Sequence, residues 1–97
     1  MKRVSILLAT GFEEIEALAP LDVLRRLNYD VELISMTNSY YVKSSHGVDI
    51  KADKLFDLER IFSKSPPFLF IKSAKLINLD FESIFPYTKV VSITGNV

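Results

Sequence analysis

The chain has 97 residues, of which 48% are hydrophobic and 25% are charged. This composition is typical of one small globular domain and excludes a disordered chain. Twelve lysine and arginine residues balance twelve aspartate and glutamate residues, so we expect no general affinity for nucleic acid or for a membrane. The sequence contains no cysteine, which excludes a disulfide framework, a thiolate zinc site and a thiol nucleophile among these residues.

The N-terminal residues resemble neither a secretory signal nor a membrane span. Lys2 and Arg3 precede a short apolar run, 4–9, and acidic residues follow soon after it. The run is too short to cross a bilayer and lacks the features of a cleavable signal. The expected location is therefore the cytoplasm.

The first three predicted elements form a β-α-β unit. The apolar run at 4–9 is typical of a strand that is covered on both faces, as in a parallel sheet. A Thr-Gly turn and an amphipathic segment come next, and they predict a helix that begins at residue 12 or 13 and ends near residue 28. A second strand is predicted at 31–36.

The predicted helix has acidic side chains in its first turn and Arg25 and Arg26 in its last, as the helix dipole favours. Pro20 lies in its interior, where a proline removes a backbone donor and clashes with the preceding turn, so we expect a kink there. Apolar residues recur at four-residue spacing, with Leu24 beside them, and predict one apolar face: Ile15, Ala19, Val23 and Leu27.

The remainder of the chain alternates between strand-like and irregular segments. Two short alternating segments around a Ser-His-Gly turn, 40–44 and 48–51, predict a half-exposed hairpin. Residues 52–62 are weakly helical. Two further strands are expected, with no clean period between them: 68–71 and 89–93.

Three acidic residues lie where the first strand gives way to the helix: Glu13, Glu14 and Glu16. Ligand sites in open α/β sheets gather at the carboxyl ends of strands. Partial desolvation there raises the pKa of a carboxylate, which can then hold or pass a proton. Spacing alone favours a simpler alternative, in which these carboxylates face water and stabilise the helix dipole.

His46 is the only histidine, and it lies in a turn. A histidine can act as a base or a metal ligand, but a site needs several convergent groups and none is evident nearby in the sequence. We therefore interpret His46 as a structural or interface residue and expect no metal. A single Gly11 is far short of a dinucleotide fingerprint or a P-loop, so we expect no cofactor. A patch suited to a partner is a further option: Phe12, Pro20, Tyr40 and Tyr41.

Several of these features occur together in one known family. A strand is followed by Gly-x-Glu-Glu-x-Glu at 11–16, and then by a proline three residues before Val-Leu-Arg-Arg at 23–26. With Ser-His-Gly-Val at 45–48 and the Lys-Ala-Asp step at 51–53, this pattern resembles the start of the ThiJ/PfpI (DJ-one) family. That family includes the parkinsonism-associated protein deglycase and bacterial proteins linked to thiazole biosynthesis. The resemblance covers about residues 2–62, which correspond to the first third of a family domain.

The resemblance implies a fold and roles for several residues. The fold would be part of an α/β three-layer sandwich, flavodoxin-like or class I glutamine amidotransferase-like, with a mainly parallel sheet. Glu16 falls on the acidic residue that hydrogen-bonds the family's nucleophilic cysteine and stabilises its thiolate. Glu13 falls on a position that contacts the second subunit of the family's dimer, and the helix that contains Pro20 belongs to the same surface. A homodimer, or a pair with an intact paralogue, is therefore expected.

Beyond residue 62 the sequence departs from the family. The strand at 68–71 would lead into a Gly-Gly turn that helps form an oxyanion hole, but Lys-Ser-Ala at 72–74 follows it here. The family's cysteine elbow and its later histidine have no counterpart. We therefore expect a family-like unit at 1–62 and a divergent extension at 63–97. Because the nucleophile is missing, we expect a truncated and catalytically inactive protein.

Two other functions stay open. The chain could take part in the family's glyoxalase or deglycase-type chemistry on reactive carbonyls if a partner subunit supplied the cysteine. It could instead be a small binding or regulatory module that uses the cleft at the strand end near Glu16.

Overall fold

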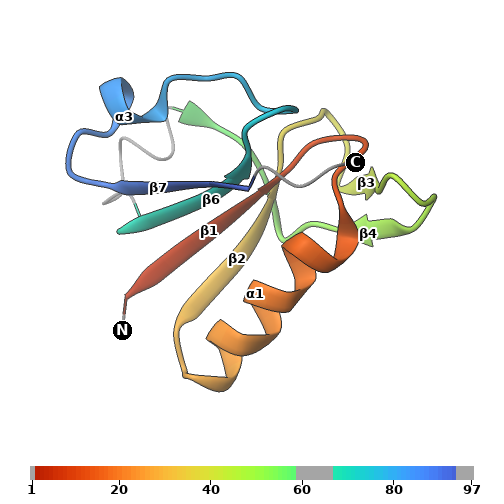
Figure 1. Ribbon diagram of the computed structural model, residues 1–97, viewed down its shortest axis with the longest axis horizontal. Coiled ribbons are helices and arrows are strands. Elements are labelled where there is room, and N and C mark those ends of the chain that lie inside the picture. The colour runs from red at the N-terminus through yellow and green to blue at the C-terminus, as the bar shows by residue number, and fades with distance from the viewer. Residues whose placement is uncertain (1, 59–66, 94–97) are drawn as a thin grey trace.

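A five-stranded sheet, parallel throughout, forms the centre of the protein (Figure 1). The computed structural model describes residues 2–58 and 67–93. Strands and helices in these residues confirm the predicted α/β class with a mainly parallel sheet. The elements are β1 (Arg3–Leu8), α1 (Glu14–Arg26), β2 (Asp30–Ser35), β3 (Tyr41–Lys43), β4 (Asp49–Lys51), β5 (Lys54–Leu55), β6 (Leu69–Ser73), α3 (Phe81–Ile84) and β7 (Lys89–Ile93).

β1 lies in the middle of the sheet and separates two groups of strands. The order across the sheet is β5-β2-β1-β6-β7. Val4 pairs with Val31 of β2 on one side and with Leu69 of β6 on the other. The strands that follow β1 in sequence, β2 and β5, lie on one side of it, and the later strands β6 and β7 lie on the other side. This reversal makes the carboxyl ends of β1 and β6 a topological switch point.

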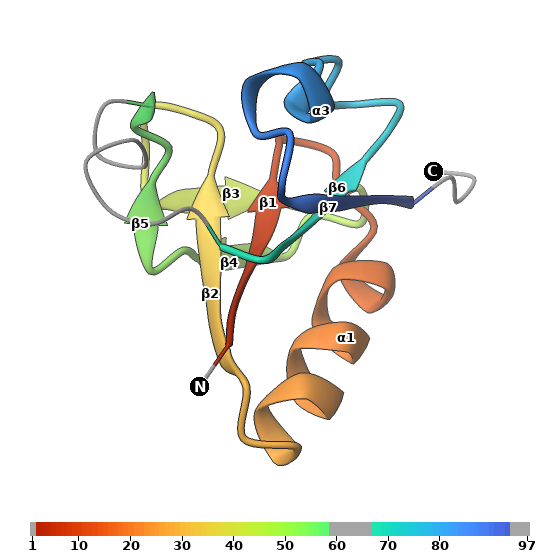
Figure 2. The same cartoon turned by 90° about the vertical axis from the view of Figure 1, so that its left-hand side faces the viewer.

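Each face of the sheet has its own apolar cluster, because alternate side chains of a strand point to opposite faces. On the face that packs against α1, Val4, Ile6 and Leu8 of β1 are buried. On the other face, the segment that contains α3 covers Leu7 and Phe70. α1 and α3 therefore lie on opposite sides of the sheet, as Figures 1 and 2 show.

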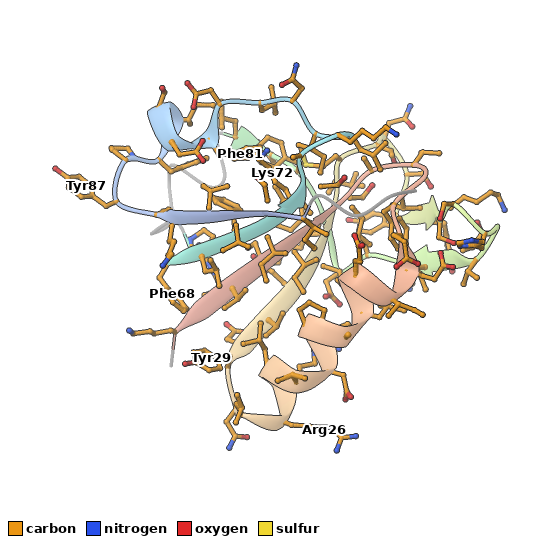
Figure 3. The ribbon with its side chains drawn as sticks, in the orientation of Figure 1. Arg26, Tyr29, Phe68, Lys72, Phe81 and Tyr87 are labelled. Carbon is orange, nitrogen blue, oxygen red and sulfur yellow. The ribbon has the colours of Figure 1, made fainter. Side chains whose placement is uncertain are left out.

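Aromatic rings fill the cluster on the α3 face. The ring centroids of Phe81 and Phe85 each lie 5.2 Å from that of Phe70. Phe81 is fully buried, whereas Tyr87, in the loop before β7, is almost completely exposed. Figure 3 shows Phe81 directed toward the sheet and Tyr87 directed away from it. Burial of several large rings in so small a domain makes this cluster a main source of its stability.

α1 is shorter than predicted at both ends. Glu13 has an extended backbone and caps the helix, because its carboxylate accepts hydrogen bonds from the N–H groups of Ile15 and Glu16. At the other end the helix stops at Arg26, because Asn28 adopts a φ of 64°, a left-handed conformation that asparagine tolerates. The predicted helix end near residue 28 is therefore wrong by two residues.

The apolar stripe predicted along the helix faces solvent. Ile15, Val23 and Leu27 are 71%, 54% and 63% exposed. Pro20 lies inside α1, and the helix continues through it. Neither α1 nor any other helix in the described residues is long and apolar enough to cross a membrane. A neighbouring face of α1 makes the contact with the sheet, through Ala17, Leu21 and Leu24.

The predicted strands of the second half are present. β7 occupies the segment predicted at 89–93, and β6 overlaps the strand predicted at 68–71 but continues to Ser73. β3 and β4 pair antiparallel and form the predicted hairpin. Between β6 and β7, where no clean period was found, the short helix α3 follows a turn.

The weak helix expected at 52–62 is wrong at Lys54 and Leu55. These two residues form β5, which pairs with the end of β2 at the edge of the sheet. Residues 59–62 lie outside the described part of the chain. The boundary predicted between residues 62 and 63 also lies outside the described residues, so the division of the chain there stays a prediction. β6 and β7, which follow that boundary in the sequence, belong to the same sheet as β1.

Candidate functional site

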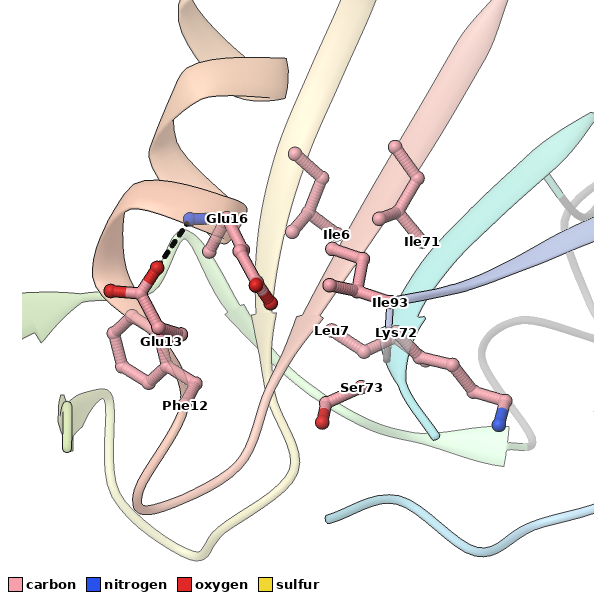
Figure 4. Close-up of a pocket in the computed structure, with 10 residues that line it drawn as sticks. Ile6, Leu7, Phe12, Glu13, Glu16, Ile71, Lys72, Ser73 and Ile93 are labelled. Atoms are coloured by element: carbon pink, nitrogen blue, oxygen red, sulfur yellow. Dashed lines mark hydrogen bonds between the residues drawn. The ribbon is translucent and has the colours of Figure 1, made fainter. Parts of the chain in front are cut away.

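A shallow pocket lies at the switch point, where β1, β6 and β7 end beside the start of α1 (Figure 4). The space in it that a water-sized molecule can occupy is only about 20 Å³. Most of the wall is apolar, with Ile6 from β1, Ile71 from β6 and Ile93 from β7. Polar groups enter the lining from Glu16 and Ser73.

Glu16 is the acidic side chain best placed to act in this pocket. It lies in the first turn of α1 and is partly buried. Figure 4 shows its carboxylate directed into the space between the helix and β1. A carboxylate in this position can hydrogen-bond a polar group brought beside it. Glu16 therefore lines the pocket, and its catalytic role stays a prediction.

β6 continues where the resemblance places a Gly-Gly turn. Lys72 and Ser73 are the last two residues of the strand and pair with β7. The Lys72 side chain is buried, and its ammonium donates a hydrogen bond of 3.1 Å to the carbonyl oxygen of Ile77. Figure 4 shows this ammonium pointing away from Glu16. These residues are paired within the sheet, so they do not form the glycine turn of an oxyanion hole.

A second group of polar side chains joins the hairpin to the helix. His46 Nδ1 lies 2.6 Å from Glu14 Oε1, and the Ser45 hydroxyl lies 3.2 Å from the same nitrogen. This contact could not be predicted from the sequence, because Glu14 and His46 are far apart along the chain. Two backbone hydrogen bonds of 2.8 Å hold the hairpin to the loop before α1, from the Gly11 N–H to the Lys43 carbonyl and from the Ser45 N–H to the Phe12 carbonyl.

Glu14 stays ionised to a lower pH than an ordinary glutamate. The nearby Ser44 hydroxyl is the main cause of its lowered pKa, and desolvation opposes that effect. The backbone N–H of Glu14 and the side chain of His46 lower the pKa further. The Glu14 side chain is 18% exposed and that of His46 is 69% exposed. Glu14 is therefore the charged, largely covered partner of this contact at neutral pH.

The predicted site residues separate into two places. His46 lies at the contact between helix and hairpin, and Glu16 lines the pocket. Glu13 belongs to both places, because it lines the pocket and lies close to His46. Pro20 lies further along α1. The interface roles of Glu13, Pro20 and His46 stay predictions. The predicted exposed patch is wrong at Phe12, which is buried in the core on the α1 face, while both of its tyrosines are exposed.

Comparisons with known proteins identify the relatives of this arrangement. The profile of the DJ-1/PfpI family matches residues 2–65. Among solved structures, a DJ-1 superfamily protein from Salmonella typhimurium is 39% identical with a TM-score of 0.65, and oxidized DJ-1 from Toxoplasma gondii is 30% identical with a TM-score of 0.66. The putative protease I from Bacteroides thetaiotaomicron shares the fold, at 12% identity and a TM-score of 0.66. No curated protein matches the chain.

The solved relatives are much longer than the matched part of this chain. The match covers 73% of this chain and 37% of the Salmonella protein, and 74% of this chain and 38% of the Toxoplasma protein. For the Bacteroides protein the two shares are 90% and 51%. The family profile covers about two-thirds of the sequence and includes β1, α1, β2 and the hairpin. The chain therefore belongs to the DJ-1/PfpI family.

Proposed function

We propose that this chain is a catalytically inactive member of the DJ-1/PfpI family. One observation carries the proposal: Glu16 faces a pocket to which this chain can bring no thiol, because none of its 97 residues is cysteine. The family's covalent chemistry needs a thiolate nucleophile, and a carboxylate that assists a thiolate has nothing to activate here. The pairing of Lys72 and Ser73 within the sheet supports the same conclusion, because it leaves the pocket without a glycine turn.

The test is the consumption of methylglyoxal, a small reactive dicarbonyl, by the purified chain. We expect wild type and Glu16→Gln to match the rate in buffer alone. Glu82→Gln, which makes the same change on an exposed residue of α3, is the control. Turnover by wild type that falls at least tenfold in Glu16→Gln but not in Glu82→Gln would overturn the proposal. Equal turnover by wild type and Glu16→Gln, above the rate in buffer, would also contradict inactivity. It would in addition rule out the role assigned to Glu16.

We further infer that α1 binds a second copy of the chain. The outward stripe of Ile15, Val23 and Leu27 leaves an apolar helix face uncovered, and exposed patches of this kind mark interaction sites. The family resemblance also assigns this helix to a dimer contact. A two-fold axis beside α1 would cover the stripe on both copies at once, because a symmetric interface uses the same surface twice.

Sedimentation velocity tests this pairing. Val23→Lys places a charge in the middle of the stripe, and Leu79→Lys makes the same change at an exposed apolar residue before α3. We expect wild type and Leu79→Lys to be dimers and Val23→Lys to be a monomer. A monomeric wild type, or a dimer that Val23→Lys leaves intact, would contradict self-pairing through α1. Pairing with an intact paralogue would then be examined by mixing the two purified proteins.

A further inference from the structure

Glu13, Glu14 and His46 form a cluster that the proposed function does not use. Each residue offers one ligand atom, and these atoms lie within 4.8 Å of one another. The carboxylates come from the start of α1 and the imidazole comes from the hairpin turn. Tertiary structure therefore assembles the cluster, and the two backbone hydrogen bonds between hairpin and loop fix the separation of its members.

One oxygen of this cluster has no partner. Glu14 Oε1 meets His46, but Glu14 Oε2 is buried and makes no hydrogen bond within residues 2–58 and 67–93. The Ser44 hydroxyl lowers the pKa of Glu14, yet it does not meet Oε2 in hydrogen-bond geometry. A buried carboxylate oxygen without a partner is unfavourable, and a bound cation would satisfy it.

We propose that Glu13, Glu14 and His46 bind one divalent first-row metal ion, with Zn²⁺ as the best match. Imidazole is a common zinc ligand and carboxylates complete many zinc sites, leaving a fourth tetrahedral position for water. Two ligand atoms on one Zn²⁺, each at about 2.1 Å, are about 3.4 Å apart at a tetrahedral angle. His46 Nδ1 and Glu14 Oε1, now 2.6 Å apart, would have to separate to that distance.

The bound ion would join the hairpin to α1 through three side chains and would replace the direct contact between His46 and Glu14. Two features weaken binding. The positive end of the helix dipole repels a cation, and Glu13 already accepts two helix N–H groups at 3.2 and 3.3 Å. We therefore expect moderate affinity, well below that of a closed structural zinc site. This site does not depend on the proposed inactivity of the pocket.

The single histidine makes a direct test possible. The imidazole signals of His46 are followed by NMR while ZnCl₂ is added to chain first treated with a chelator. We expect saturable shifts at one Zn²⁺ per chain and a higher thermal midpoint, because an ion that binds only the folded state stabilises it. Calorimetry on the variants should give binding at least about tenfold weaker in Glu14→Gln and His46→Gln. Glu82→Gln, with its charge change far from the cluster, should bind as wild type does.

Each outcome of this experiment decides the proposal. Loss of affinity in both ligand variants, with wild-type circular dichroism, supports it. Unchanged affinity in His46→Gln, absence of saturable shifts, or more than one Zn²⁺ per chain would overturn it. Should Glu14→Gln fail to fold, the result with His46→Gln decides alone, because that side chain is largely exposed and its loss does not threaten the core.

Discussion

The Lys72 ammonium donates a hydrogen bond to the Ile77 carbonyl across the turn that follows β6. Both residues are buried, so this bond holds the segment that leads to α3 against the sheet. A buried cation is unfavourable without such a partner. Lys72 therefore has a structural role near the position where the family resemblance places an active-site glycine.

We expect Lys72→Met to destabilise the protein by about 1–3 kcal/mol, because the methionine keeps the apolar stem but leaves the Ile77 carbonyl without its donor. Urea unfolding followed by circular dichroism measures the free energy. Lys75→Met, at an exposed lysine in the next turn, is the control and should change stability by less than about 0.5 kcal/mol. A Lys72→Met protein as stable as wild type would mean that burying the ammonium costs as much as its bond contributes.

Phe81 should be among the residues most sensitive to truncation. Phe81→Ala removes a fully buried ring that contacts Phe70 and Phe85, and such changes cost about 3–5 kcal/mol. That is a large part of the total stability of a small domain. Tyr87→Ala, which removes an aromatic ring that is 99% exposed, should leave the urea midpoint unchanged. Equal effects of the two changes would contradict the placement of α3 over the sheet.

The lowered pKa of Glu14 predicts sensitivity to acid. A carboxyl whose pKa is lower in the folded than in the unfolded chain takes up its proton more readily on unfolding. Its contribution is complete above the unfolded pKa and is lost as the pH falls through the folded pKa, so stability should decline below about pH 5. Glu14→Gln should reduce this decline in a series of urea midpoints. A decline of the same size in the variant would mean that other carboxyls cause it. Asp80, with its pKa lowered by Ser83, is the first of these to test, through Asp80→Asn.

Gly47 should tolerate asparagine better than alanine. Its φ is 79°, and a Cβ built there meets no atom within 4 Å, so backbone strain alone sets the cost of a side chain. We expect Gly47→Ala to cost about 1–2 kcal/mol and Gly47→Asn less, because asparagine adopts the left-handed region more readily. Thermal unfolding of both variants measures the difference. If asparagine proved as costly as alanine, steric contact rather than strain would be the cause.

The sequence predicted the central strands because their burial on two faces produces continuous apolar runs. Val4 to Leu8 and the core residues of β6 are such runs, and the structure places them side by side. β5 was missed because Lys54 and Leu55 are a two-residue pairing with exposed side chains and no recognisable pattern. The helix shows a different failure. The spacing of apolar residues identified one face of α1, but it could not tell whether that face contacts the core or is exposed to solvent. The face is exposed.

The candidate site was half predictable. Glu16 could be located because the end of β1 and the start of α1 are adjacent in sequence. The contact between Glu14 and His46 could not be predicted, because it depends on how the hairpin packs against the start of the helix. The orientation of the Lys72 side chain could not be predicted either. Side chains alternate between the two faces of the sheet along β6, and the face on which Lys72 lies is known only once the pairing of β6 with β1 is known.

The central position of β1 also shapes the order in which the protein can be assembled. Among the described strands, β1 comes first along the chain, and its pairing with β2 needs only the intervening helix. Its other edge stays open until Leu69 has emerged to pair with Val4. Contacts between such distant residues form slowly, because a long loop must close before they stabilise anything. Until then the nascent chain carries a central apolar strand with one unpaired edge, and an edge of this kind can pair with another chain.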